Sequence, residues 1–337
     1  MLETPPRCRT ALFGVVVGTT TSEGKERVKV ELHQLRCLLA VIEEGGFNRA
    51  TTRLHITQPA LSYQIKQLEG ELGIRLFDRR PGGVSPTEAG RLLARHARQV
   101  LEAVRQARQS VEELAQGVNG EVRIGTVNSV GIYFLPQLLW SLRKQYPRLR
   151  PHVLYRHSNE IIEALLANQV DLALVANPSS DRRLHTEVII EEQVWLVCGR
   201  GHSFFGRKNI RPSELKGAQF VALSQESPTG RLVRDHLARM GISVEPVVST
   251  DNVETVKKMV EIGLGVAFLP EMVTSGEVHC DDGTGGRLAR LQVGPPITRR
   301  IVLAYWKNSE LSRATATFVE QLREYAEGWK GCIEPDQ

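Results

Sequence analysis

The spacing of apolar residues predicts three short helices near the start of the chain. Apolar residues recur at steps of three and four from Leu32 to Ile42, and Gly45-Gly46 ends that helix. A second helix is expected from Phe47 to Leu54. The third begins with Thr57 as its N-cap and ends before Gly73. Its inner face repeats at steps of four, three and four, through Leu61, Ile65, Leu68 and Leu72.

The outer face of the third helix is polar and can reach base edges or phosphates. Two helices joined by a tight turn, the second with a polar face, make a helix-turn-helix. The segment from Leu76 to Thr87 then predicts two short strands around a glycine turn, a basic wing beside the helix. The DNA-binding residues expected here are Thr57, Gln58, Pro59, Ser62, Tyr63, Lys66, Arg79 and Arg80. A small three-helix core that binds no nucleic acid is the alternative.

A long helix is expected from Thr87 to about Gln116. Its apolar residues repeat every 3.5 residues over three heptads, which is typical of a coiled-coil seam. The seam predicts a homodimer, and a dimer predicts a roughly palindromic DNA site. Its members are Leu93, Ala97, Val100, Val104, Ala107, Val111 and Leu114.

Beyond a hinge at residues 117–120, predicted strands alternate with predicted helices. The first set includes strands at 122–127, 152–156 and 171–176, and a similar set follows from 220 to 269. Such alternation predicts a parallel sheet covered by helices on both faces. Two similar α/β units indicate a cleft between them, a common place for a small ligand.

Charge and composition sharpen this interpretation. The chain of 337 residues carries a net charge of +5, and 41% of its residues are hydrophobic, as in ordinary globular proteins. The segment from Gly45 to Arg98 contains nine basic and four acidic residues. Its net charge of +5 equals that of the whole chain. Phosphate contacts need such a local surplus. No apolar run approaches the roughly 20 residues that span a bilayer.

The cysteines and the first residues add little chemistry. Five scattered cysteines form no CxxC pair, so buried free thiols are expected, with a redox pair of Cys198 and Cys280 as the alternative. Residues 1–29 lack helical periodicity and are interpreted as a disordered leader. A mis-assigned start is the other interpretation, with Val28 as the true first residue.

Several segments resemble the LysR-type transcriptional regulators. The resemblance lies in Gly46-Phe47-Asn48-Arg49-Ala50, Thr57-Gln58-Pro59-Ala60-Leu61-Ser62, Leu72-Gly73-Ile74-Arg75-Leu76-Phe77 and Gly263-Leu264-Gly265-Val266-Ala267-Phe268-Leu269-Pro270. It covers about residues 30–328. Thr57 replaces the usual Ser, and Tyr63 stands where a basic or small polar residue is common, so base preference should differ there.

The resemblance implies an α/β protein with an all-α winged helix-turn-helix domain at its N-terminus. That domain is expected at 30–88, a linker helix that forms the dimer at 89–117, and a periplasmic-binding-protein-like effector domain at 121–328. Its first lobe would comprise 121–196 and 299–328, and its second 197–298. Such cytoplasmic proteins usually form homotetramers on promoter DNA, where a small effector alters DNA bending and recruitment of RNA polymerase.

The same resemblance places the effector between the lobes, at helix N-termini that follow strands. Hydroxyls and free N–H groups at helix starts favour an anion, so a small carboxylate or phosphate is expected. Plain helix capping is the alternative for each hydroxyl. The matching residues are Asn128, Ser129, Ser158, Ser227, Thr229 and Arg231.

Other classes of protein find no support in the sequence. Phosphate-loop, nucleophile-elbow and zinc-protease motifs are absent, so we expect no enzyme, no catalytic residue, no cofactor and no metal site. Gly263-Leu264-Gly265 falls in an apolar, strand-like run and is interpreted as packing. A solute-binding protein would lack the DNA-reading helix, and a general chromatin protein would lack the two lobes.

Overall fold

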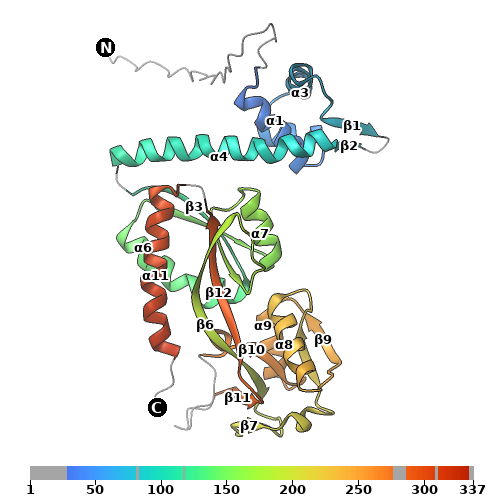
Figure 1. Ribbon diagram of the computed structural model, residues 1–337, viewed down its shortest axis with the longest axis vertical. Helices are drawn as coiled ribbons and strands as arrows, with labels where there is room; N and C mark the ends of the chain where they lie inside the picture. The colour runs from blue at the N-terminus through green and yellow to red at the C-terminus, as the bar shows by residue number, and fades with distance from the viewer. Residues whose placement is uncertain (1–28, 81–82, 117, 276–285, 308–309, 334–337) are drawn as a thin grey trace, which may run out of the picture. The chain divides into compact units, whose positions relative to one another are not determined.

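The computed structural model describes residues 29–80, 83–116, 118–275, 286–307 and 310–333. Side chains are described for all of these except residues 79, 80, 83, 109, 110, 112–116 and 330–333. The chain divides into two compact units, residues 1–108 and 109–337, which we describe separately (Figure 1). Residues 1–28 of the expected leader, Pro81 and Gly82 of the expected wing turn, and Gly117 of the expected hinge lie outside the described residues.

The first unit contains the three predicted helices. Helix α1 spans Leu32–Glu43, α2 spans Phe47–Leu54 and α3 spans Gln58–Leu72. The turn before α3 is tight because His55 takes the left-handed conformation, with φ of 54°. Leu38, Leu61 and Leu68 are fully buried and form the centre of the core between the helices.

A two-stranded wing follows α3. Strands β1 (Phe77–Arg80) and β2 (Gly83–Pro86) pair antiparallel, with Phe77 opposite Pro86. The wing is tied to α3 because Glu69 Oε1 accepts hydrogen bonds from the backbone N–H groups of Leu76 and Phe77, at 2.7 and 3.2 Å. The structure therefore contains the predicted winged helix-turn-helix.

Helix α4 (Glu88–Gln116) is the predicted long helix, but its seam is divided. Leu93 and Ala97 pack into the core of the first unit itself. Val100 and Val111 are exposed, the latter by 68%, and the side chain of Leu114 lies outside the described residues. The part of the seam that is open to a partner therefore begins near Val100, later than the heptad pattern predicted.

The second unit is built on a mixed sheet with the order β4-β3-β5-β12-β6-β11-β7, and β10 also pairs with β6. Strands β3 (Gly120–Thr126), β4 (Leu149–Tyr155) and β5 (Leu172–Ala176) are parallel, as predicted. Strand β12 (Ile297–Trp306) is antiparallel to both β5 and β6, so the prediction of a wholly parallel sheet is wrong.

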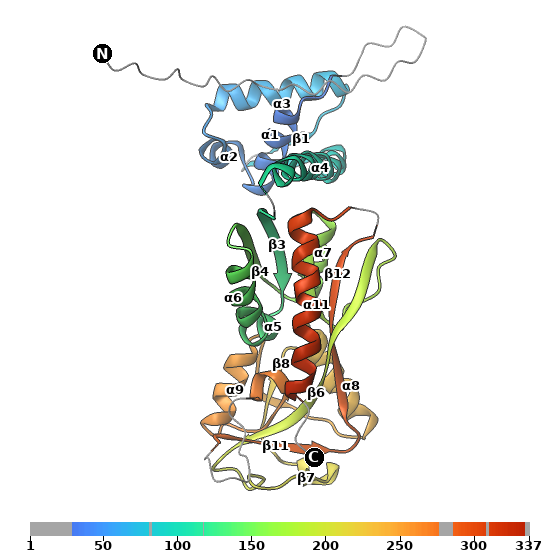
Figure 2. The ribbon, with the colours of Figure 1, turned by 90° about the vertical axis from the view of Figure 1, so that its left-hand side faces the viewer.

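The long strand β6 (Leu184–Gly199) was not predicted. It pairs with β12 along its length and with β10 (Ala267–Pro270) and β11 (Leu288–Val293) at its end. In Figure 2, β6 and β12 run together from the region of β3 and α7 to that of β11 and β7 (Asn209–Ile210). The two lobes thus share these strands.

Helices cover this sheet and a separate parallel pair, β8 (Phe220–Leu223) and β9 (Pro246–Thr250). Gly263 to Gly265 forms a turn before β10 instead of lying within a strand. The helices are α5 (Asn128–Tyr133), α6 (Leu135–Gln145), α7 (Ser158–Leu166), α8 (Pro228–Arg239), α9 (Val253–Glu261), α10 (Glu271–Thr274) and α11 (Arg313–Ile333), with a 3₁₀ turn at Pro212–Leu215.

Candidate DNA-reading surface and effector cleft

The outer face of α3 is open to solvent. Gln58, Pro59 and Lys66 are exposed, Ser62 is half-buried, and Tyr63 is 58% exposed. The Tyr63 hydroxyl accepts a hydrogen bond from Gln67 Nε2 at 2.9 Å, which holds the ring along the helix. These groups point outward because Leu61, Ile65 and Leu68 occupy the opposite face.

Thr57 and the wing lie at the two ends of this surface. Thr57 precedes α3 in extended backbone, but its side chain makes no capping hydrogen bond. Arg79 and Arg80 lie in β1, and their side chains are outside the described residues. The side chains of the candidate DNA-reading surface that the structure describes are therefore mainly those of α3.

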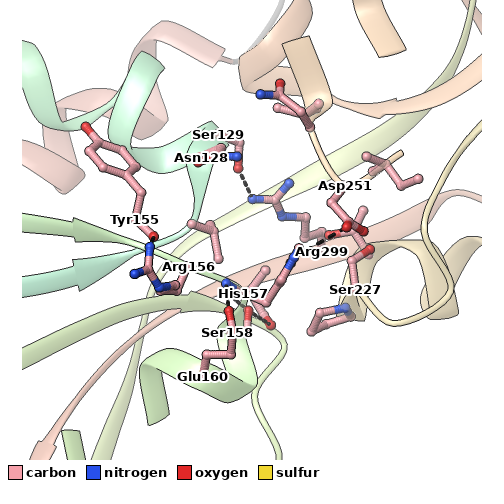
Figure 3. Close-up of a pocket in the computed structure, with 17 residues that line it drawn as sticks. Asn128, Ser129, Tyr155, Arg156, His157, Ser158, Glu160, Ser227, Asp251 and Arg299 are labelled. Atoms are coloured by element: carbon pink, nitrogen blue, oxygen red, sulfur yellow. Dashed lines mark hydrogen bonds and ion pairs between the residues drawn. The ribbon is translucent and has the colours of Figure 1, made fainter. Parts of the chain in front are cut away.

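A cleft of about 300 Å³ lies in the second unit (Figure 3). It is lined by the N-terminal ends of α5, α7, α8 and α9, so four helix starts converge on one space. Helix starts present unpaired N–H groups and partial positive charge. Five predicted effector residues line it: Asn128, Ser129, Ser158, Ser227 and Thr229.

Two of the hydroxyls in the cleft wall also hold the backbone in place. Ser158 Oγ donates to the carbonyl of Ala176 at 3.2 Å and accepts from its N–H at 3.3 Å, which joins α7 to β5. Ser227 caps α8 by accepting from the N–H of Gly230 at 2.9 Å. The capping interpretation therefore applies to Ser227, while Ser158 links two elements.

Arg231 does not line the cleft. It follows the first turn of α8, and its Nη1 donates to the carbonyl of Glu226 at 2.9 Å, over the preceding loop. Two arginines line the cleft instead, Arg156 and the buried Arg299 of β12, and the sequence reasoning missed both. Figure 3 shows the Arg299 guanidinium pointing toward Ser129, whose Oγ accepts from Nη2 at 2.6 Å.

Arg299 is buried beside Glu192 of β6. Their side chains are 3% and 0% exposed, and Nε lies 3.5 Å from Glu192 Oε1. Glu192 Oε2 accepts from the N–H of Met272, but Oε1 and Arg299 Nε have no hydrogen-bond partner in the described part of the chain. Burial raises the pKa of Glu192 and lowers the pKa of Arg299, and each ion opposes its partner's shift.

Polar contacts link the lobes on either side of the cleft. The Tyr133 hydroxyl of α5 donates to Glu254 Oε1 of α9 and accepts from Lys257 Nζ at 2.5 Å. Burial and the bond to Glu254 raise the pKa of Tyr133 to about 12. His157 Nε2 lies 3.7 Å from Asp251 Oδ2. These pairs connect α5 and the start of α7 to α9 and the loop that precedes it.

Metal and thiol chemistry find little support in the described residues. No group of three or more metal-binding side chains occurs among them. Cys37 and Cys198 are buried, and burial raises the pKa of both thiols, that of Cys198 to about 11. Cys280, the other member of the redox alternative, lies outside the described residues. Every helix in the described part of the chain is too short or too polar to span a bilayer.

Two family models match the chain. The model of the LysR-family bacterial regulatory helix-turn-helix protein matches residues 32–91, and that of the LysR substrate binding domain matches residues 115–327. A probable RuBisCO transcriptional regulator of Cyanophora paradoxa is 32% identical over 75% of this chain and 80% of its own length. A hydrogen peroxide-inducible genes activator of Pectobacterium carotovorum is 27% identical over 89% of this chain and 98% of its own length.

Solved structures support the same fold. A variant of full-length OxyR from Pseudomonas aeruginosa is similar with a TM-score of 0.66 and 23% identity, covering 88% of this chain and 95% of its own. Full-length CbnR complexed with its target DNA is similar with a TM-score of 0.63 and 22% identity. The match covers 88% of this chain and 100% of that one. With a winged helix-turn-helix followed by a substrate-binding domain, the chain belongs to the LysR family of DNA-binding transcriptional regulators.

Proposed function

We propose that this regulator responds to a small anionic effector, a carboxylate or a phosphate, bound in the cleft between its lobes. The observation that carries the proposal is the buried guanidinium of Arg299 at the cleft wall, where Nη2 already bonds Ser129. Arginine presents several N–H donors in a planar fork that suits carboxylate and phosphate oxygens. The surrounding helix starts add favourable potential for an anion.

The remaining charges of the cleft refine the ligand. Besides Arg299, the cleft is lined by two acidic side chains, Glu160 and Asp251, and by two basic ones, Arg156 and His157. Its wall therefore carries groups of both signs. We expect the effector's acidic group to face Arg299 and Ser129, and hydroxyl groups to face the carboxylates. A volume of about 300 Å³ is at the small end of ligand pockets, which favours a compact metabolite.

The two cysteines whose side chains the structure describes, Cys37 and Cys198, favour reversible binding over thiol oxidation. One relative is named for induction by hydrogen peroxide, and oxidation selects cysteines that are exposed and ionised. Cys37 and Cys198 are buried, with raised pKa values. Relatives named as probable RuBisCO regulators make a metabolite of carbon fixation a reasonable first class to screen.

At the DNA, we propose that Gln58 and Ser62 read base edges and that Lys66 contacts phosphate. Tyr63 would stack, touch a thymine methyl or bond a phosphate. Thr57, Pro59, Arg79 and Arg80 would complete the contact surface. We propose the domain limits expected from the sequence, with DNA reading at 30–88, pairing of copies at 89–117 and effector binding at 121–328.

Pairing of two copies would use the exposed part of α4. Val100, Val104 and Val111 continue the 3.5-residue repeat after Leu93 and Ala97 are taken up by the core. A dimer places two reading helices on a palindromic promoter site. We propose that two dimers form a homotetramer in the cytoplasm, and that effector binding rotates the lobes, changes the DNA bend and alters contact with RNA polymerase.

Calorimetry on the full-length protein tests the anionic effector. Succinate and glycerol phosphate would be titrated beside their neutral counterparts, succinamide and glycerol, and a wider panel of paired acids would follow. We expect binding only from acids, and Ser129→Ala should weaken it about tenfold because Arg299 loses its positioning partner. Ser213→Ala, an exposed serine outside the cleft, is the matched control. Binding confined to neutral or cationic compounds would refute the proposal.

A further inference from the structure

The second lobe contains a cavity of about 580 Å³ that is separate from the effector cleft. It lies between α8 and the strand pair β8–β9. The N-terminal end of α8 lines the cleft, while Val233, Arg234 and Leu237, further along the helix, line the cavity. Leu223 alone among the described residues belongs to both walls.

The floor of this cavity is apolar. Phe220, Leu237, Ile242 and Phe268 are buried members of the lobe's core, and the rings of Phe220 and Phe268 stack with centroids 6.5 Å apart. A space of this size and lining is within the range of small-molecule sites, which are mostly apolar with a few polar groups. The opening in the core can therefore take an apolar body without disturbing a polar network.

Irregular backbone forms the cavity wall opposite α8. The register of β8 against β9 shifts between Phe220 and Val221, so the two strands do not pair as a regular ladder. The chain leaves α8 through Gly241, whose φ of +71° favours glycine, and returns to β9 through the half-buried Val244. The shifted strands and this turn line the space opposite α8.

One charged side chain stands at the cavity. Arg234 is the single charged residue among the described residues that line it. Its Nη1 donates to Gln225 Oε1 at 2.8 Å, and its Nη2 lies 3.5 Å from Asp235. The side chains of Arg234 and Asp235 are 46% and 64% exposed. Ion pairs between side chains so exposed contribute little to stability. The guanidinium can therefore exchange Asp235 for the acidic group of a ligand.

We propose that this cavity is a second ligand site that takes an amphipathic acid, with an aromatic or aliphatic body inside and its anionic group on Arg234. Its chemistry differs from that of the cleft, where the polar wall suits a compact, hydroxylated anion. The site is independent of the effector proposed for the cleft, because its lining residues are different apart from Leu223.

The probe for this site is 8-anilinonaphthalene-1-sulfonate, an aromatic anion that fluoresces in apolar surroundings. Fluorescence titration of the full-length protein should give one saturable site. Ala222→Leu and Ala238→Leu add bulk to the cavity wall and should each weaken binding at least tenfold. Ala103→Leu adds the same side chain at an exposed position of α4 in the first unit, and should leave the affinity unchanged.

The proposed contact between Arg234 and the ligand's anionic group is tested by a second pair of variants. Arg234→Ala should weaken binding of the probe about fivefold, whereas Arg239→Ala, on the same helix but outside the cavity, should not. Ser129→Ala in the cleft should also have no effect, so that failure of the cleft proposal would not be mistaken for failure of this one. Equal binding by both leucine variants and the wild type would overturn the proposal, as would loss of binding in Ser129→Ala.

Discussion

The reading face of α3 and the effector cleft use polar residues in opposite ways. On α3, Gln58 and Lys66 are exposed and Tyr63 is mostly so. At the cleft wall, Arg299 is almost fully buried, as is its ion-pair partner Glu192. Exposed polar groups keep their hydration until DNA arrives, whereas buried ions must be paired for the fold to persist. Substitutions should therefore separate recognition from stability on α3 and affect both in the cleft.

The largest effect should come from Arg299→Met. This change leaves Glu192 as a buried carboxylate without its cation, which costs about 3–5 kcal/mol of stability. Urea unfolding of the full chain, followed by tryptophan fluorescence, would report the loss in the transition of the second unit. The double variant Arg299→Met with Glu192→Met should recover most of it, because no uncompensated charge remains. A single variant as stable as the wild type would contradict the account.

A smaller effect is expected from Gln58→Ala, and in recognition alone. If Gln58 reads a base by two hydrogen bonds, its loss should cost about 1–3 kcal/mol of discrimination at one position of the site. Selection of duplexes from a random library, by wild type and variant in parallel, measures this. Unfolding should be unchanged. Identical selected sites would show that Gln58 does not read a base.

The smallest effect should follow from Lys66→Ala. Loss of one phosphate contact should weaken binding evenly across sequences and reduce the slope of log K against log salt by about 0.9. Lys258→Ala is the matched control, an exposed lysine of the second unit that pairs with Glu261. A variant with lower discrimination but an unchanged slope would move Lys66 from phosphate contact to base reading.

The same difference between exposed and buried polarity explains what could be predicted from the sequence. Helices α1 to α3 follow a clean apolar repeat, so their limits were found almost to the residue. The strand β6 was missed because Glu187, Glu191 and Glu192 interrupt its apolar pattern. Glu192 is nevertheless buried, through an ion pair with a residue more than 100 positions away. No local pattern could reveal that pairing.

Arg299 was missed although a signal for it exists. It alternates with Ile297 and Ile301 on the buried face of β12, while Thr298 and Arg300 are exposed. A charged residue in the inward register of a strand indicates either a pair or a ligand. Sequence position favours Arg231 as the cation because it follows a helix start, but its side chain bonds the loop before α8. Whether an arginine side chain reaches the cleft depends on its rotamer and on the geometry of the neighbouring loop. Neither can be predicted from the spacing of residues in the sequence.

If α3 belongs to a site-specific regulator, its preference for its own site should persist when salt weakens its contacts with phosphates. The most direct test compares the affinity of the full-length protein for a library-selected duplex and for random duplex as salt rises from about 50 to about 300 mM. We predict that both affinities fall while their ratio stays at about 10³ or more. A ratio that approaches one at the higher salt would contradict the account and leave only general electrostatic binding.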